Sequence, residues 1–206
     1  MEALQKKLYT ESEYLELERV SPTKSEFYRG ELFAMAGASL IHNTLVSNII
    51  FSFMSQLQNK PCSVYPSDLR LRVNKSGLYT YPDVSIICGN PILAPNTSDT
   101  VTNPTVLIEV LSDSTEKYDR GQKFQFYREI ESLQEYVLVS SSHKRVEVFR
   151  KMLDRNWLLL DSIETNSITL ESVGCTVRMD DLYKGITFME EGNSADESRY
   201  NQSNHP

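Results

Sequence analysis

The fold is decided by two stretches, Tyr81-Pro82-Asp83-Val84-Ser85-Ile86-Ile87 and Val106-Leu107-Ile108-Glu109-Val110-Leu111-Ser112, each of which sets one acidic residue in an apolar, strand-like run. Burying an unpaired carboxylate is costly or forces it to take up a proton, so acidic residues are rare at such positions. A basic helical segment, residues 119–128, follows the second run. Two carboxylates on neighbouring strands with a lysine nearby favour a site for a hard divalent cation and an activated water.

The composition is that of a globular protein with one core. A chain of 206 residues that is 40% hydrophobic can bury one substantial core, so we expect a single domain over residues 1–188. Residues 189–206 are polar and acidic without apolar periodicity, which predicts a disordered tail. The net charge of −7 argues against a protein that coats nucleic acid generally. It is compatible with an enzyme that meets nucleic acid through one local basic surface.

The cysteines and the hydropathy pattern predict a soluble cytoplasmic protein. Cys62, Cys88 and Cys175 are far apart and odd in number, which is typical of neither a disulfide framework nor a zinc site and fits a reducing compartment. The first residues lack the pattern of a signal peptide. No apolar run approaches the roughly 18 residues that span a bilayer.

The order of the elements predicts the α/β class, with a mixed central β-sheet flanked by helices. Thr10 and Glu13 form a capping-box pattern that opens a first helix, and residues 26–35 are typical of a hairpin that turns at Arg29-Gly30. Apolar spacing predicts a long buried helix over 39–58. Further strands are expected at 62–65, 68–73, 135–140, 145–150 and 156–160, a helical turn at 179–183, and a long loop at 89–104.

Each candidate residue also has a structural interpretation. Asp83 could cap the start of a strand, and Glu109 could belong to a buried pair with an arginine or lysine. Lys123 follows Asp119 by four residues, the spacing of an exposed ion pair of roughly 0.3–0.5 kcal/mol. Because the two acids occur together, the functional interpretation of Asp83 and Glu109 is the better one. His42, at the start of the long helix, and Asp68, at the start of an alternating strand, could each face solvent or the site.

Several blocks together resemble the Uma family of restriction endonucleases, long classed as a domain of unknown function, within the PD-(D/E)XK nuclease superfamily. The resemblance covers roughly residues 8–188 and implies a restriction-endonuclease-like core. It rests on the order and spacing of residues 26–32, 42–43, 67–73, 81–84, 108–112, 118–124 and 133–137.

The resemblance implies a site for Mg²⁺ or Mn²⁺. Asp83 is similar to the aspartate of the PD element and Glu109 to the first acid of the (D/E)XK element, with the backbone carbonyl of Val110 as a third ligand. The lysine of that element would stand at position 111, where this chain has Leu111. Other branches of the superfamily carry the lysine on the following helix, where Lys123 is the candidate and Gln122 the next. Supporting roles are open to His42, Asp68 and Gln122, and DNA phosphate contacts to Arg70, Arg72 and Arg120.

Three functions remain open at this stage. The first is a Mg²⁺-dependent DNA endonuclease, for which a homodimer is expected because two strands are most simply cut by two symmetric sites. The second is a non-catalytic relative that uses the nuclease fold to bind nucleic acid or protein. The third is a metal-dependent hydrolase of a small phosphate ester, which would need a closed pocket rather than an open groove.

Overall fold

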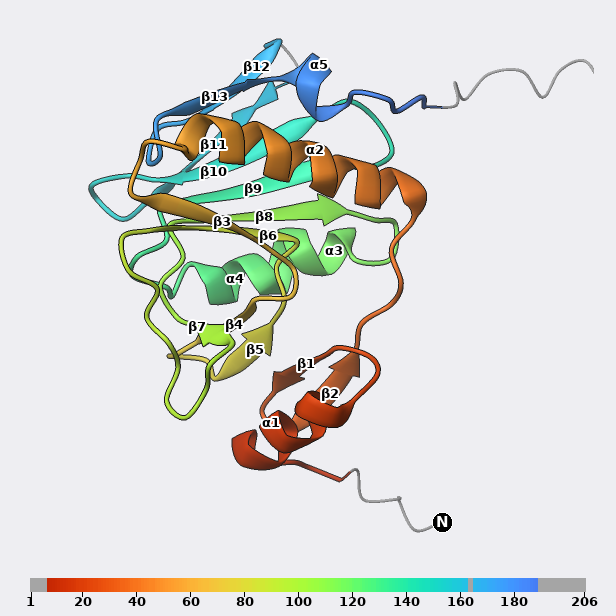
Figure 1. The fold of residues 1–206 in the computed structure, drawn as a ribbon, viewed down its shortest axis with the longest axis vertical. Coiled ribbons are helices and arrows are strands. Elements are labelled where there is room, and N and C mark those ends of the chain that lie inside the picture. The colour runs from red at the N-terminus through yellow and green to blue at the C-terminus, as the bar shows by residue number, and fades with distance from the viewer. Residues whose placement is uncertain (1–6, 163–164, 189–206) are drawn as a thin grey trace, which may run out of the picture.

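A mixed six-stranded sheet forms the centre of the molecule in the computed structural model, which describes residues 7–162 and 165–188 (Figure 1). Its strands run in the order β11-β10-β9-β8-β6-β3, and only β8 and β9 are parallel. The strands are β3 (Cys62–Pro66), β6 (Val84–Cys88), β8 (Val106–Leu111), β9 (Glu135–Ser140), β10 (Val146–Lys151) and β11 (Trp157–Asp161). All residues of β8 and β9 are buried, because helices or strands cover both faces.

One face of this sheet is covered by the long helix α2 (Leu40–Leu57), which Ser39 caps by accepting the backbone N–H of His42. Leu45, Ile49 and Phe53 recur at helical spacing and pack onto the sheet, as the sequence predicts. The same face carries the small hairpin of β12 (Ser167–Leu170) and β13 (Cys175–Arg178), followed by α5 (Met179–Leu182). The sequence pattern predicted neither β12 nor β13.

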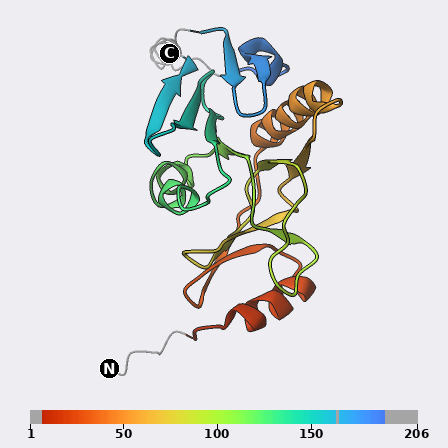
Figure 2. The ribbon, with the colours of Figure 1, turned by 90° about the vertical axis from the view of Figure 1, so that its left-hand side faces the viewer.

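The opposite face is covered by a broken helical segment (Figure 2). It consists of α3 (Glu116–Tyr118), a π-helical turn (Asp119–Lys123) and α4 (Phe124–Tyr127). Phe124 and Tyr127 point at Tyr136 of β9, which fixes this segment to the sheet. Single π-turns inside helices occur often at functional sites, because they redirect side chains without ending the helix.

A second sheet lies beside the first, toward the N-terminal end of the chain (Figure 2). Its order is β2-β1-β5-β4-β7, with β1 (Ser25–Tyr28), β2 (Glu31–Ala34), β4 (Arg70–Val73), β5 (Leu78–Thr80) and β7 (Thr100–Val101). Arg29 and Gly30 form the hairpin turn with φ of 49° and 88°, the left-handed conformation of a type I′ turn. Helix α1 (Glu11–Val20) packs on this sheet through Tyr14, which contacts Phe27 and Tyr79.

Most predicted elements are confirmed, and the predicted α/β class with a mixed sheet is confirmed with them. The predicted long loop at 89–104 is wrong in part, since it contains β7 and a bridge between Leu93 and Val101. The interpretation of the cysteines is also wrong. Cys62 and Cys88 lie directly opposite each other on β3 and β6 and form a disulfide, while Cys175 is buried and free.

Two further expectations concern the C-terminal residues and membrane-spanning helices. The predicted tail at 189–206 lies outside the described residues. Among the residues that the structure describes, no helix is both long and apolar enough to cross a membrane.

Candidate active site

The two acidic residues that the sequence singles out lie side by side. Val84 of β6 pairs with Ile108 of β8, so the antiparallel register brings Asp83 opposite Glu109. The backbone N–H of Asp83 lies 3.4 Å from Oε2 of Glu109, and the N–H of Val110 donates to Oδ2 of Asp83 at 2.7 Å. The sheet itself therefore holds both carboxylates at one point.

Lys123 reaches the same point from the π-helical turn. Its Nζ lies 2.9 Å from Oε1 of Glu109 and 3.3 Å from Oδ1 of Asp119. The side chain is buried, not exposed as the spacing to Asp119 alone suggested. Leu111 is buried among the apolar residues on the same face as Glu109, so the ammonium near Glu109 comes from the helical segment rather than from position 111.

Glu26 is the site residue that sequence reasoning missed. It belongs to β1, is buried, and places Oε1 3.6 Å from Nζ of Lys123. Tyr118 donates its hydroxyl to the other oxygen at 2.9 Å, and the hydroxyl of Thr80 donates to Oε1. The only sequence signal was its place in a block that resembles the Uma family. An acidic residue next to Phe27 in an alternating strand otherwise predicts a solvent-facing position.

Two tyrosines complete the walls of the site. Tyr127 donates its hydroxyl to Oε1 of Glu109 at 2.8 Å, and Tyr136 donates to the backbone carbonyl of Asp119 at 3.1 Å. Both side chains are fully buried. The cluster of charged groups is thus closed off by aromatic rings on the helix side, which strengthens the electrostatic interactions inside it.

His42 approaches Asp83 from the first turn of α2. Its Nε2 lies 3.1 Å from Oδ2 of Asp83. Burial opposes the charged imidazolium while the Asp83 carboxylate favours it, and the balance raises the pKa of His42. His42 therefore orients Asp83 from the face of the sheet opposite to Lys123, and it lies where the sequence placed a supporting residue.

The cluster carries more negative than positive charge. Burial, together with the nearby carboxylates of Asp83 and Asp119, raises the pKa of Glu109 to about 8 against the attraction of Lys123. Burial also raises the pKa of Asp119. Burial lowers the pKa of Lys123, but Glu109, Asp119 and Glu26 outweigh it and raise that pKa well above its ordinary value. One ammonium thus serves several buried carboxylates.

That surplus of carboxylates fits a divalent cation. Oδ2 of Asp83 accepts hydrogen bonds from the N–H of Val110 and from Nε2 of His42, and neither of these groups bonds to Oδ1. No group of three or more His, Cys, Asp or Glu side chains within residues 7–162 and 165–188 is arranged as a metal-binding set. The expected ligands are different: two carboxylates, Asp83 and Glu109, and one backbone carbonyl, that of Val110. Oxygen donors of this kind suit Mg²⁺, which usually keeps several of its waters.

Several predicted contacts lie away from the cluster. Asp68 is 84% exposed and pairs with Lys24 at 2.5 Å. Arg70 is buried and forms a two-pronged ion pair with Asp99, so it is not available to a phosphate as predicted.

The other polar candidates lie nearer the surface. Arg72 pairs with Glu11, and Arg120 pairs with Glu116 and Glu147; both guanidinium groups remain partly exposed. Gln122 is exposed on the π-helical turn.

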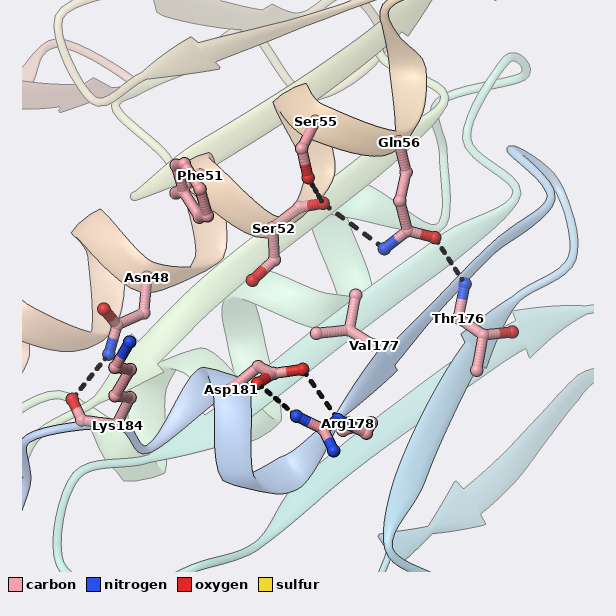
Figure 3. A pocket seen from close by; sticks show the side chains of 10 residues that line it. All are labelled: Asn48, Phe51, Ser52, Ser55, Gln56, Thr176, Val177, Arg178, Asp181 and Lys184. Carbon is pink, nitrogen blue, oxygen red and sulfur yellow. Dashed lines mark hydrogen bonds and ion pairs between the residues drawn. The ribbon is translucent and has the colours of Figure 1, made fainter.

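A separate hollow of about 610 Å³ lies between α2 and the β13–α5 segment (Figure 3). Its walls include Phe51 and Ser52 of α2 and Arg178, whose guanidinium is paired with Asp181. Because α2 and β13 cover the face of the sheet opposite to Lys123, this hollow is not part of the acidic cluster.

Known proteins resemble this chain in sequence. Residues 11–178 match the family model described as "Uma2: Putative restriction endonuclease". The "Uncharacterized protein sll1609" of Synechocystis is 40% identical over 161 residues, which are 78% of this chain and 91% of that protein. The "Uncharacterized protein slr1290" of the same organism is 35% identical over 176 residues, 85% of this chain and 92% of that protein.

A solved structure extends the comparison to the fold. The crystal structure of "a putative nuclease belonging to DUF820" from Anabaena variabilis aligns with a TM-score of 0.68 at 17% identity, over 84% of this chain and 96% of that one. The predicted nuclease-like fold is therefore confirmed. The chain belongs to the Uma2 family.

Proposed function

We propose that this protein is a DNA endonuclease that hydrolyses phosphodiester bonds. It would use Mg²⁺ or Mn²⁺ as its cofactor and Asp83, Glu109 and Lys123 as its catalytic residues. The observation that carries the proposal is the ammonium of Lys123 at 2.9 Å from Glu109, which lies opposite Asp83 on the neighbouring strand. This ammonium comes from the helical segment instead of from position 111. Membership of the Uma2 family supports a nuclease.

The residues divide the chemistry among them. Asp83, Glu109 and the Val110 carbonyl would hold the cation, which when bound lowers the pKa of a water and polarises a phosphate oxygen. Lys123 orients the attacking water and offsets the negative charge that develops on the phosphate. Glu26 and Asp119 keep Lys123 protonated, and Tyr127 fixes one oxygen of Glu109.

The proposal is tested by cleavage of supercoiled plasmid with Mg²⁺, with Mn²⁺ and with a chelator. We expect nicked or linear products only with metal, and none from Asp83→Asn or Glu109→Gln. Lys117→Ala is the matched control, because Lys117 is an exposed lysine on the same helical segment. Metal binding by calorimetry without any cleavage would instead indicate a non-catalytic nuclease fold. Hydrolysis of a small phosphate ester without cleavage of DNA would indicate the third function.

We also propose that the protein acts as a homodimer, since each chain offers one cluster and a duplex has two strands.

Arg72 and Arg120 are the partly exposed cations that remain candidates for phosphate contacts. Raising the salt concentration should weaken DNA binding if such contacts contribute.

A further inference from the structure

The central sheet ends in an open, apolar edge. β11 pairs only with β10 and is the last strand in the sheet order. Leu158 and Leu159 are 45% and 47% exposed on its two faces, and the preceding loop exposes Met152 and Leu153. Natural proteins usually protect such edges with proline, lysine or a bulge, because an open edge is a template for another strand. The opposite edge strand, β3, has Pro66 at its end; β11 contains neither proline nor lysine.

The backbone of β11 offers hydrogen-bonding groups to that edge. Lys151 of β10 donates its N–H to the carbonyl of Gln134, on the side of β10 that faces away from β11. Lys151 and Trp157, which lie opposite each other on β10 and β11, therefore form a pair without backbone hydrogen bonds between them. By the alternation of antiparallel ladders, Trp157 and Leu159 therefore direct their N–H and C=O groups outward, where no strand of the described chain pairs with them. These outward groups can pair with another extended strand.

We propose that the partner strand is β11 of a second copy, and that two chains pair antiparallel about Leu159. This deepens the homodimer proposed above and does not depend on cleavage. Antiparallel pairing of identical strands is two-fold symmetric, so every contact is made twice. Leu159 then faces Leu159 of the second copy and exchanges both backbone hydrogen bonds with it.

The apolar side chains of β11 also favour this register. Pairing about Leu159 sets Leu158 of each chain opposite Leu160 of the other, so the central three residues of both strands meet as apolar pairs. A contact between two five-residue strands is small against the roughly 1,200 Å² of stable interfaces, so the dimer is weak and depends on concentration.

The test is the mass of the full chain by sedimentation over a rising concentration series. We expect the mass to rise from 23.6 kDa toward twice that value for the native chain, and to stay at 23.6 kDa for Leu159→Lys. Met54→Lys is the matched control, because Met54 is an apolar residue of α2 that is 54% exposed and lies outside β11. This variant should have the same mass as the native chain at each concentration.

Two results would overturn the interface. One is a native chain that remains at 23.6 kDa throughout; the other is a dimer abolished by Met54→Lys and kept by Leu159→Lys. If Leu159→Lys does not fold by circular dichroism, Leu158→Lys replaces it, and it should weaken the dimer because it sets an ammonium against Leu160 of the second copy. Since the readout is mass, the result is independent of any nuclease activity.

Discussion

At the scale of single residues, Lys123 has the largest predicted effect. Replacing Lys123 by alanine should abolish metal-dependent cleavage, because Lys123 is the one lysine of residues 7–162 and 165–188 that forms an ion pair with Glu109. Since the lysine is buried among carboxylates, its loss should also destabilise the fold, on the order of 3–5 kcal/mol, unless the acids take up protons. Cleavage assays and urea unfolding of the same preparation separate the two effects. Native cleavage rates from Lys123→Ala would contradict the assignment.

Glu26 is expected to act through Lys123 rather than on the substrate. Glu26→Gln removes a negative charge 3.6 Å from Nζ of Lys123 and keeps the shape of the side chain, with one acceptor oxygen left for the hydroxyls of Thr80 and Tyr118. We expect the cleavage rate to fall about tenfold, the lower range for residues that support a metal site, with little change in substrate binding. Glu16→Gln, the same change at an exposed position on α1, is the control. An equal loss in both variants would rule out a specific role for Glu26.

These residues also show what a sequence can reveal about this site. Asp83 and Glu109 are conspicuous because a carboxylate in an apolar strand needs an explanation. Arg70 and Arg72 were misleading: they alternate with leucines and imply a solvent-facing side, but α1 and the Asp99 loop cover that side through Glu11, Tyr14 and Asp99. The pairing of Cys62 with Cys88 likewise depends on β3 lying beside β6, which local sequence does not encode.

At the scale of elements, the π-helical turn carries both Asp119 and Lys123 to the sheet. It contains Gly121, whose φ is not in the left-handed region, and a Cβ added there meets no atom within 4 Å. The glycine is therefore not required by space or by backbone conformation. Periodicity predicted the helix over 119–128 but could not predict the extra residue in its turn.

Gly121→Ala should accordingly stabilise the protein. Alanine reduces the conformational freedom of the unfolded chain, and the gain is about 0.5–1 kcal/mol in a helical position. Urea unfolding should show a higher midpoint with an unchanged slope, and cleavage should persist. A loss of cleavage with a stable fold would mean that the turn must change shape during the reaction.

At the scale of the whole molecule, the surplus of buried carboxylates makes stability depend on pH. The pKa of Glu109 is raised to about 8 from an ordinary value of 4.5. Between these values the folded state holds a proton that the unfolded chain releases, so the free energy of unfolding falls as pH rises through this window. The fall should amount to a few kcal/mol. The raised pKa of Lys123 keeps its charge constant over the same range.

The measurement is urea unfolding with a chelator at several pH values spanning that window. Glu109→Gln should flatten the dependence, because the amide does not titrate. Saturating Mg²⁺ should stabilise the native chain most at the alkaline end, where the carboxylates are charged and bind the cation best. A slope that is the same in the native chain and in Glu109→Gln would show that other groups cause it.

The contact between the N-terminal hairpin and the helical segment affects when the charged cluster forms during synthesis. Glu26 and Lys123 are 97 positions apart (123 − 26) yet meet in one cluster. During synthesis the chain emerges N-terminus first, so Asp83 and Glu109 leave the ribosome before Lys123 does. A nascent or truncated chain thus carries both acids without their lysine partner, and the charged cluster is complete only when the π-helical turn has docked on the sheet.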